Sequence, residues 1–437
     1  MDYSFSLVED TENCLCGSGN AFQKCCKLRL SEAKPKQSLG SFKGDSHLSH
    51  FMQDWYKKTS ISQCLHPNQS ECQGNIINAH ALQNNGVLTK IAVDSHVMAV
   101  NHLAKIRKQV VVRTLTPENI KNTIEMSSGH HRKELLEVLS KVDKVELFAF
   151  MGQTCELEID MPVIEFEMKK LSINKATTFR GFCSLHDKIV FKPIEDFAYI
   201  GTEEQNFLFS YRTFSQEYYE QIAVEQIKKE HFYENPKLCY NHSFVQEYRY
   251  AINKKRHLDR MKNILDTALI SENFSTLTSK KVKLTKPCDF ALTSVILPEV
   301  DLEGNVLNDA YLSNKDSRHI LLTIFPTDTE TVILFSWLAQ DNLFFESYSH
   351  QIGQLTENEV KHYTSNLISY SPNIVIGPKL WNAMSENEKA SFQKSLEFQM
   401  EETAFGQSTP KFLSAKRNET LKKRKYLLET PSYDLFR

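Results

Sequence analysis

Four cysteines within thirteen residues are the sequence feature that most constrains how this chain can fold. The segment NCLCGSGNAFQKCC contains two pairs separated by eight residues: Cys14 and Cys16, then Cys25 and Cys26. The glycines between the pairs let the backbone turn, so both pairs can converge on one tetrahedral ion. So short a peptide has too little core to fold alone, and a bound metal would supply its folding free energy. The alternative is a disordered arm with four free thiols or a redox pair.

This segment also resembles a known motif. Cys-x-Cys-Gly-Ser-Gly followed by a Cys-Cys pair is similar to the SEC-C zinc-binding motif, over about 20 of the 437 residues. In that family the motif is an accessory module, best known at the tail of the preprotein-translocating ATPase, where it contacts a partner. It is also attached to many unrelated bacterial proteins. The resemblance implies a bacterial zinc-binding protein whose module binds a protein partner, and it does not identify a reaction.

Composition narrows the class of protein further. The chain has 52 Lys and Arg against 54 Asp and Glu, so no global basic field attracts it to nucleic acid. Its longest apolar run, Val332–Ala339, is far shorter than the roughly 18–20 residues of a membrane span. The N-terminus, MDYSFSLVED, lacks the charged-then-apolar order of a signal peptide. We therefore expect a cytoplasmic protein without membrane contact, with its ten cysteines reduced.

A second set of ligand-type residues is split between two segments. One segment contains Cys64 and Cys72, and about 100 residues later the sequence GFCSLHD contains Cys183 and His186 in a chelating Cys-x2-His turn. Two cysteines and a Cys/His pair make four ligands, so we predict a second zinc site. His66 is an alternative ligand, and some of these residues would otherwise be ordinary core or surface positions.

The same region resembles a degenerate His-Asn-His (ββα-metal) nuclease core. In that family an opening His activates water, and a closing turn contributes a ligand for a catalytic divalent cation. The resemblance implies that His80, in NAHAL, is the catalytic base, with Mg²⁺ or Mn²⁺ as the cation. A neutral imidazole and a cation are what phosphodiester hydrolysis needs. Asp187 or Glu195 would add oxygen ligands.

The sequence departs from that family at several positions. In that family an Asn a few residues before the closing turn orients the opening His. Here that Asn has no clear counterpart, since Asn174 is nine residues before Cys183. Ala79 precedes His80, where many members have an acidic metal ligand. In addition, His186 cannot serve both a structural zinc and a catalytic ion. The alternative interpretation is a purely structural zinc knuckle.

Positive charge is concentrated in two stretches. Arg249–Lys286 has ten Lys and Arg against three acids, and Lys411–Lys425 has seven against one. Such stretches can neutralise phosphates, so we expect DNA or RNA to bind there, although a solvated helix face also explains a charge run.

Hydrophobic periodicity predicts a multidomain α+β protein. We expect a zinc module and linker at 1–45, a central split-site region at 46–200, a helical basic region at 201–286 and a C-terminal α+β domain at 287–437. Helices are expected at 203–232, 244–269, 356–370 and 385–401, and also over IINAHALQ and VIEFEMKKL. Strands are expected near 90–100, 109–115, 290–297, 320–325 and 331–339, and the block 178–195 is expected to be a turn followed by a short strand.

The chain lacks the P-loop, dinucleotide-binding and nucleophile-elbow motifs, so ATPase, Rossmann dehydrogenase and α/β-hydrolase interpretations have no sequence signal. The leading hypothesis is a zinc-binding, nucleic-acid-associated bacterial protein with metal-dependent nuclease activity and a role in defence against foreign DNA. The alternative is a non-enzymatic adaptor in which both zinc sites are scaffolds.

Overall fold

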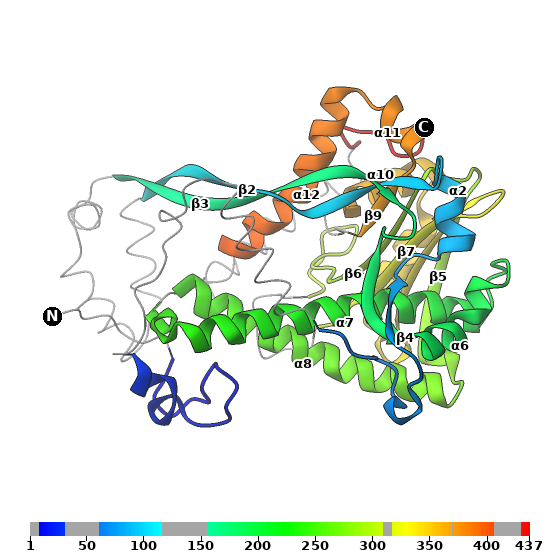
Figure 1. Ribbon diagram of the computed structural model, residues 1–437. Coiled ribbons are helices and arrows are strands. Elements are labelled where there is room, and N and C mark those ends of the chain that lie inside the picture. The colour runs from blue at the N-terminus through cyan, green and yellow to red at the C-terminus, as the bar shows by residue number, and fades with distance from the viewer. Residues whose placement is uncertain are drawn as a thin grey trace.

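The computed structural model describes residues 8–30, 61–115, 155–240, 242–308, 317–368, 371, 373–405 and 430–437, with only the backbone in 101–115 and 155–166. The fold is a mixture of helices and sheets, as predicted (Figure 1). Seven strands form an antiparallel sheet in the order β3-β2-β9-β6-β7-β8-β5. These strands are β2 (His96–Leu115), β3 (Cys155–Ser172), β5 (Leu277–Leu284), β6 (Phe290–Ile296), β7 (Ile320–Pro326), β8 (Thr331–Leu338) and β9 (Ile374–Ile376).

Helices cover both faces of this sheet (Figure 1). Every residue of β7 and β8 is buried, and neighbouring residues point to opposite cores because strand side chains alternate. On one face Val332 and Leu334 join the core that contains α7 (Glu203–Glu234). On the other face Ile333 and Phe335 join a core formed with α9 (Glu346–Gln354), α10 (Glu357–Leu367), α11 (Pro378–Ala383) and α12 (Glu386–Phe405).

Two long helices lie side by side below the sheet, α7 and α8 (His242–Ile270), joined through η6 (Pro236–Tyr240) (Figure 1). The Thr202 hydroxyl accepts a hydrogen bond from the backbone N–H of Gln205 and caps α7. The aromatic residues at helical spacing along α7 are core residues: Phe207, Tyr211 and Phe214 are buried, and Tyr218 packs against them.

A separate pair of strands carries the split cysteine site. β1 (Ile76–His80) pairs antiparallel with β4 (Thr178–Cys183), and α6 (Ser184–Glu195) follows β4 directly. The β2–β3 hairpin is inserted between β1 and β4 and extends beyond the large sheet (Figure 1). The pair and α6 therefore form a strand-strand-helix unit whose halves are far apart in sequence.

Several sequence predictions are wrong here. IINAHALQ is not helical, because its β-branched residues pair with β4 as strand β1. VIEFEMKKL is strand β3, since its acidic and apolar residues alternate with the period of two that a strand requires. The expected strands at 90–100 and 109–115 fall in one strand, β2, which begins only at His96, and the block 178–195 is strand β4 followed by helix α6.

Other predictions agree with the structure. The expected strands near 290–297, 320–325 and 331–339 are β6, β7 and β8, and four expected helices are α7, α8, α10 and α12. β5 and β9 were missed, and short elements complete the described chain: η1 (Phe22–Lys24), η2 (Cys26–Arg29), η4 (Gln69–Glu71), η5 (Asn84–Leu88), α2 (Thr89–Ile91), η7 (Phe274–Thr276) and η8 (Ala339–Asp341). The large sheet takes strands from three of the four predicted regions, 46–200, 201–286 and 287–437. The basic tail Lys411–Lys425 lies outside the described residues.

In the part of the chain that the structure describes, no helix has the length and apolar character needed to cross a membrane.

Candidate functional site

The structure brings the four N-terminal cysteines together. The sulfur atoms of Cys14, Cys16, Cys25 and Cys26 all lie within 4.8 Å of one another, and those of Cys16 and Cys25 are 3.4 Å apart. A tetrahedral zinc with bonds of about 2.3 Å places its sulfur ligands about 3.8 Å apart, so this group can hold a metal ion of that size. Gly17 and Gly19 have φ of 73° and 77°, the left-handed conformation that the turn between the pairs requires.

Burial affects the protonation of these thiols. It raises the pKa of Cys14 to about 11 and also raises the pKa of Cys26. At Cys16 burial acts in the same direction, but hydrogen bonds from Ser18 outweigh it and lower the pKa to about 7. Because thiolates are the metal ligands, binding of a metal to this site would release protons.

The N-terminal module packs against the adjoining ends of α7 and α8. Phe22 contacts Phe232 with ring centres 6.3 Å apart, in a core that also contains three of the four cysteines. The buried hydroxyl of Tyr248 donates a hydrogen bond to the Leu15 carbonyl oxygen at 2.7 Å. At the edge, Arg29 lies over the ring of Tyr233 at 4.3 Å. The candidate metal ligands and the helix ends therefore share one core.

The second predicted set of ligands also converges. The Nδ1 atom of His186 is 3.4 Å from the sulfur of Cys64, 3.6 Å from that of Cys72 and 3.3 Å from that of Cys183. His66 is not in this group: its ring stacks on that of His186 at 3.8 Å, and its Nδ1 accepts a hydrogen bond from the backbone N–H of Asn68. The three cysteines and His186 form a ligand set that suits zinc.

This placement resolves the conflict over His186. The side chain faces the cysteines, whereas the next residue, Asp187, faces a polar pocket. The cysteine site also joins the end of β4 to the first turn of α6, because Cys183 is the last residue of the strand and His186 lies in the helix. A metal there would hold the strand-strand-helix unit together.

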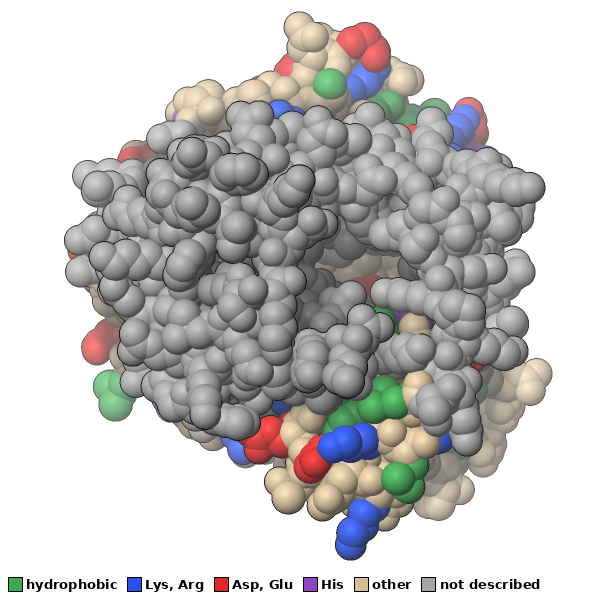
Figure 2. All heavy atoms as spheres, turned by 90° about the vertical axis from the view of Figure 1, so that its left-hand side faces the viewer, with side chains coloured by type: hydrophobic (Ala, Val, Ile, Leu, Met, Phe, Trp, Pro, Cys, Tyr) green, Lys and Arg blue, Asp and Glu red, His purple; other side chains and the backbone are tan. Residues whose placement is uncertain are grey.

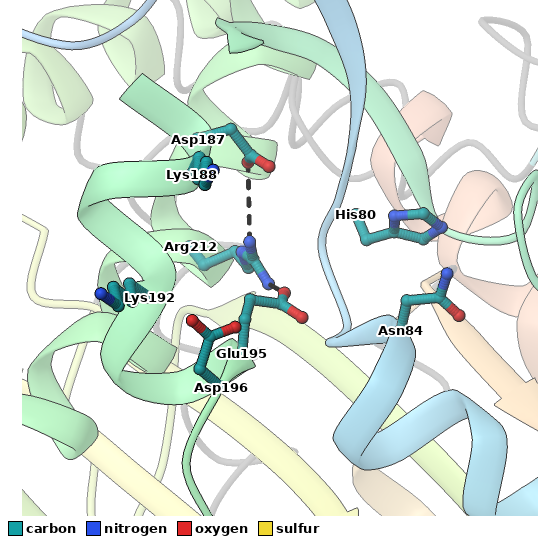
Figure 3. Close-up of a pocket in the computed structure, with 8 residues that line it drawn as sticks. All are labelled: His80, Asn84, Asp187, Lys188, Lys192, Glu195, Asp196 and Arg212. Atoms are coloured by element: carbon teal, nitrogen blue, oxygen red, sulfur yellow. Dashed lines mark hydrogen bonds and ion pairs between the residues drawn. The ribbon is translucent and has the colours of Figure 1, made fainter. Parts of the chain in front are cut away.

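The pocket beside this unit has a volume of about 250 Å³. Figure 3 shows His80 and Asn84 on one side and Asp187, Glu195 and Arg212 on the other, with α6 providing most of the opposite wall. All of its lining residues are polar or charged: His80, Asn84, Asp187, Lys188, Lys192, Glu195, Asp196 and Arg212.

His80 has a defined orientation in this pocket. Its Nε2 lies 2.9 Å from the carbonyl oxygen of Ile173, and burial lowers its pKa from the usual 6.5. Because a carbonyl only accepts hydrogen bonds, Nε2 carries the proton and Nδ1 is the basic nitrogen. The Asn174 side chain, a candidate to orient the imidazole, instead accepts a hydrogen bond from Asn84 at 3.2 Å. The imidazole of His80 is therefore oriented by the backbone carbonyl of Ile173, whereas the His-Asn-His pattern has an Asn side chain in that position.

Arg212 was not identified by sequence reasoning, yet it is central to the pocket. It is 1% exposed, forms an ion pair with Glu195, and lies 3.5 Å from Asp187. Its guanidinium lies over the ring of Phe191 at 4.0 Å. Asp187, Phe191 and Glu195 are spaced four apart on α6, so they lie on one face of the helix and all three contact Arg212. The only sequence signal was an arginine within the apolar stripe of α7.

Some polar atoms around the pocket lack a hydrogen bond, although Asp187 Oδ1 still lies 3.5 Å from Arg212 in an ion pair. Asn84 Oδ1, Asp187 Oδ1 and Arg212 Nε are buried and make no hydrogen bond. Each such group costs about 1–3 kcal/mol, and functional sites are where that cost is tolerated. Burial also raises the pKa of Asp187, although Arg212 opposes that shift. Among the described residues, only the two cysteine groups bring three or more ligand atoms into one cluster.

Much of the basic stretch Arg249–Lys286 is already neutralised by nearby acids. In the described part of the chain, ion pairs of this stretch include Arg249–Glu12, Lys254–Glu217, Lys255–Asp259, Lys262–Asp266 and Lys283–Glu330. On one end of the molecule, acidic and basic side chains lie beside each other over the described surface (Figure 2). Binding of DNA or RNA through this stretch stays a prediction.

Comparison of the chain with protein-family models, with curated proteins and with solved structures found no match. The SEC-C and His-Asn-His resemblances therefore rest on the residues described above, and function has to be argued from the geometry.

Proposed function

We propose that the protein hydrolyses phosphodiester bonds of nucleic acid in the pocket of His80, with zinc as a structural ion in both cysteine sites. The observation that carries this proposal is the position of His80, which lines a polar pocket on the side opposite Asp187 and Glu195 (Figure 3). An imidazole packed into an apolar wall would have supported a scaffold instead.

The arrangement of the strands and the helix around the pocket also supports this proposal. β1, β4 and α6 form two antiparallel strands followed by a helix, with His80 at the end of the first strand and Asp187 in the first turn of the helix. This is the arrangement expected of a ββα-metal core, and the cysteine site at its base would keep the unit folded despite the inserted hairpin.

Each residue has a defined chemical task in the proposed reaction. His80 Nδ1 takes a proton from the attacking water, and Nε2 stays bonded to the Ile173 carbonyl, which keeps the ring in place. Asp187, whose buried Oδ1 has no hydrogen-bond partner, would hold Mg²⁺ or Mn²⁺. Such a cation stabilises the charge that develops on the phosphate oxygens. Arg212 forms ion pairs with both carboxylates, and because the pair with Asp187 is the longer one, at 3.5 Å, Asp187 is the better placed of the two to bind a cation.

Purified protein with Mg²⁺ or Mn²⁺ should nick plasmid DNA or degrade RNA. His80→Ala should abolish cleavage and leave the zinc content unchanged, and His350→Ala, an exposed histidine of α9, is the matched control. Absence of cleavage by the wild type under any divalent ion would end the enzyme hypothesis. A nuclease of this kind would suit defence against foreign DNA.

One observation favours the adaptor as a second candidate. Leu28, in η2 of the zinc module, is 70% exposed, and SEC-C modules contact protein partners. An adaptor predicts no cleavage but capture of a specific partner that Leu28→Ser abolishes.

A further inference from the structure

The pocket offers no Phe, Tyr or Trp ring on which a nucleobase could stack. None of its lining residues is Phe, Tyr, Trp or aliphatic, and its volume of about 250 Å³ is below the roughly 300 Å³ at which small-molecule pockets begin. Bases bind proteins by stacking on aromatic rings or through hydrogen bonds to their edges. A charged phosphodiester suits this lining, whereas stacking of the adjoining base requires an aromatic ring outside it.

An exposed aromatic residue lies immediately beside the pocket. Phe197 follows Asp196, which lines the pocket, in the connection between α6 and α7. Its side chain is 60% exposed, and Ile200 in the same connection is 76% exposed. Neither side chain belongs to the cores formed by the described residues, so the ring of Phe197 is open to solvent one residue along the chain from the pocket lining.

Two lysines on the pocket wall are not neutralised by the acids around them. Lys188 and Lys192 are exposed and stand one turn apart on α6. In the described part of the chain no ion pair involves either lysine, whereas Arg212 pairs with Asp187 and Glu195. Both lysines are thus available to neutralise backbone phosphates of a strand that reaches the pocket along α6.

We infer, resting on the proposed function, that the substrate is single-stranded nucleic acid, with an unpaired base stacked on Phe197 and its flanking phosphates held by Lys188 and Lys192. In a duplex the bases stack on each other inside the helix, so this ring has no base to contact unless one is flipped out. Aromatic stacking beside backbone cations is the general mode of binding for single strands without sequence preference.

Binding can be separated from cleavage in the His80→Ala protein. Fluorescence anisotropy with a labelled 12-nucleotide single strand and with the corresponding duplex, at several salt concentrations, should show tighter binding of the single strand. Phe197→Ala should weaken that binding roughly tenfold, and Phe197→Tyr should retain it because the ring is kept. Lys188→Gln and Lys192→Gln should each reduce the slope of log affinity against log salt by about 0.7.

Matched controls are Leu343→Ala, which removes an 88% exposed side chain elsewhere, and Lys394→Gln on α12. Equal or tighter binding of the duplex, or no effect of Phe197→Ala, overturns the inference. Its failure is distinguishable from failure of the proposed function. Single-strand binding without cleavage by the wild type removes only the enzyme activity, and cleavage with duplex preference removes only the substrate assignment.

Discussion

The Nε2 atom of His80 lies 2.9 Å from the carbonyl oxygen of Ile173, which comes directly after strand β3. This one hydrogen bond decides which nitrogen of the imidazole carries the proton, and it leaves Nδ1 as the base. The long insertion between the two halves of the site is thus part of the site, since the end of its hairpin orients the proposed catalytic residue.

The pH dependence of cleavage should follow His80. A general base acts when it is unprotonated, and burial lowers the pKa of His80 below 6.5. The rate should therefore be at its plateau at neutral pH and fall on acidification, with the midpoint below pH 6.5. The measurement is kcat/KM between pH 4.5 and 8. A midpoint above pH 7 would assign the base to another group.

Zinc content should be near two equivalents per chain. Cys16→Ser and Cys183→Ser remove one ligand from different sites, so each variant should keep about one equivalent, as measured by mass spectrometry of the purified protein. Cys239→Ser changes a buried cysteine outside both groups and should keep two. A wild-type value of one would leave one of the two clusters without its ion.

Arg212 should be a large contributor to stability. Arg212→Met leaves Asp187 and Glu195 without their partner and should lower the free energy of unfolding by about 3 kcal/mol in urea titrations. Adding Glu195→Gln removes one of the two unpaired charges and should restore part of the loss. Arg318→Met, at a 40% exposed arginine paired with Asp341, should cost less than about 1 kcal/mol.

Docking of the zinc module should depend on Tyr248. Tyr248→Phe removes the hydroxyl that donates to the Leu15 carbonyl and should lower the unfolding free energy of zinc-loaded protein by about 1 kcal/mol. Tyr233→Phe, at a 52% exposed ring, should leave stability unchanged. Equal stability of the two variants would show that the module is held by other contacts.

Local sequence patterns predicted those helices and strands whose burial leaves a periodic signal in the sequence. Strands β7 and β8 are buried on both faces, which gives continuous apolar runs in the sequence. Helix α7 has aromatic residues at helical spacing, which gives a period of 3.6. β1 was mistaken for a helix because five residues are too few to show a period. β5, with three lysines in eight residues, has no strand signature, and its pairing with β8 decides its conformation.

The sequence by itself determined the ligand chemistry: the close spacing of Cys14, Cys16, Cys25 and Cys26, and the Cys-x2-His turn at Cys183 and His186. The sequence also predicted that Cys64 and Cys72 join that turn, but only the tertiary structure decided that His66 stays out of the group, that His186 faces sulfur while Asp187 faces the pocket, and that Arg212 lies between the carboxylates. The physical reason is distance along the chain. Spacing within a turn is set by local backbone geometry, whereas contacts over a hundred residues depend on how strands pair and helices pack.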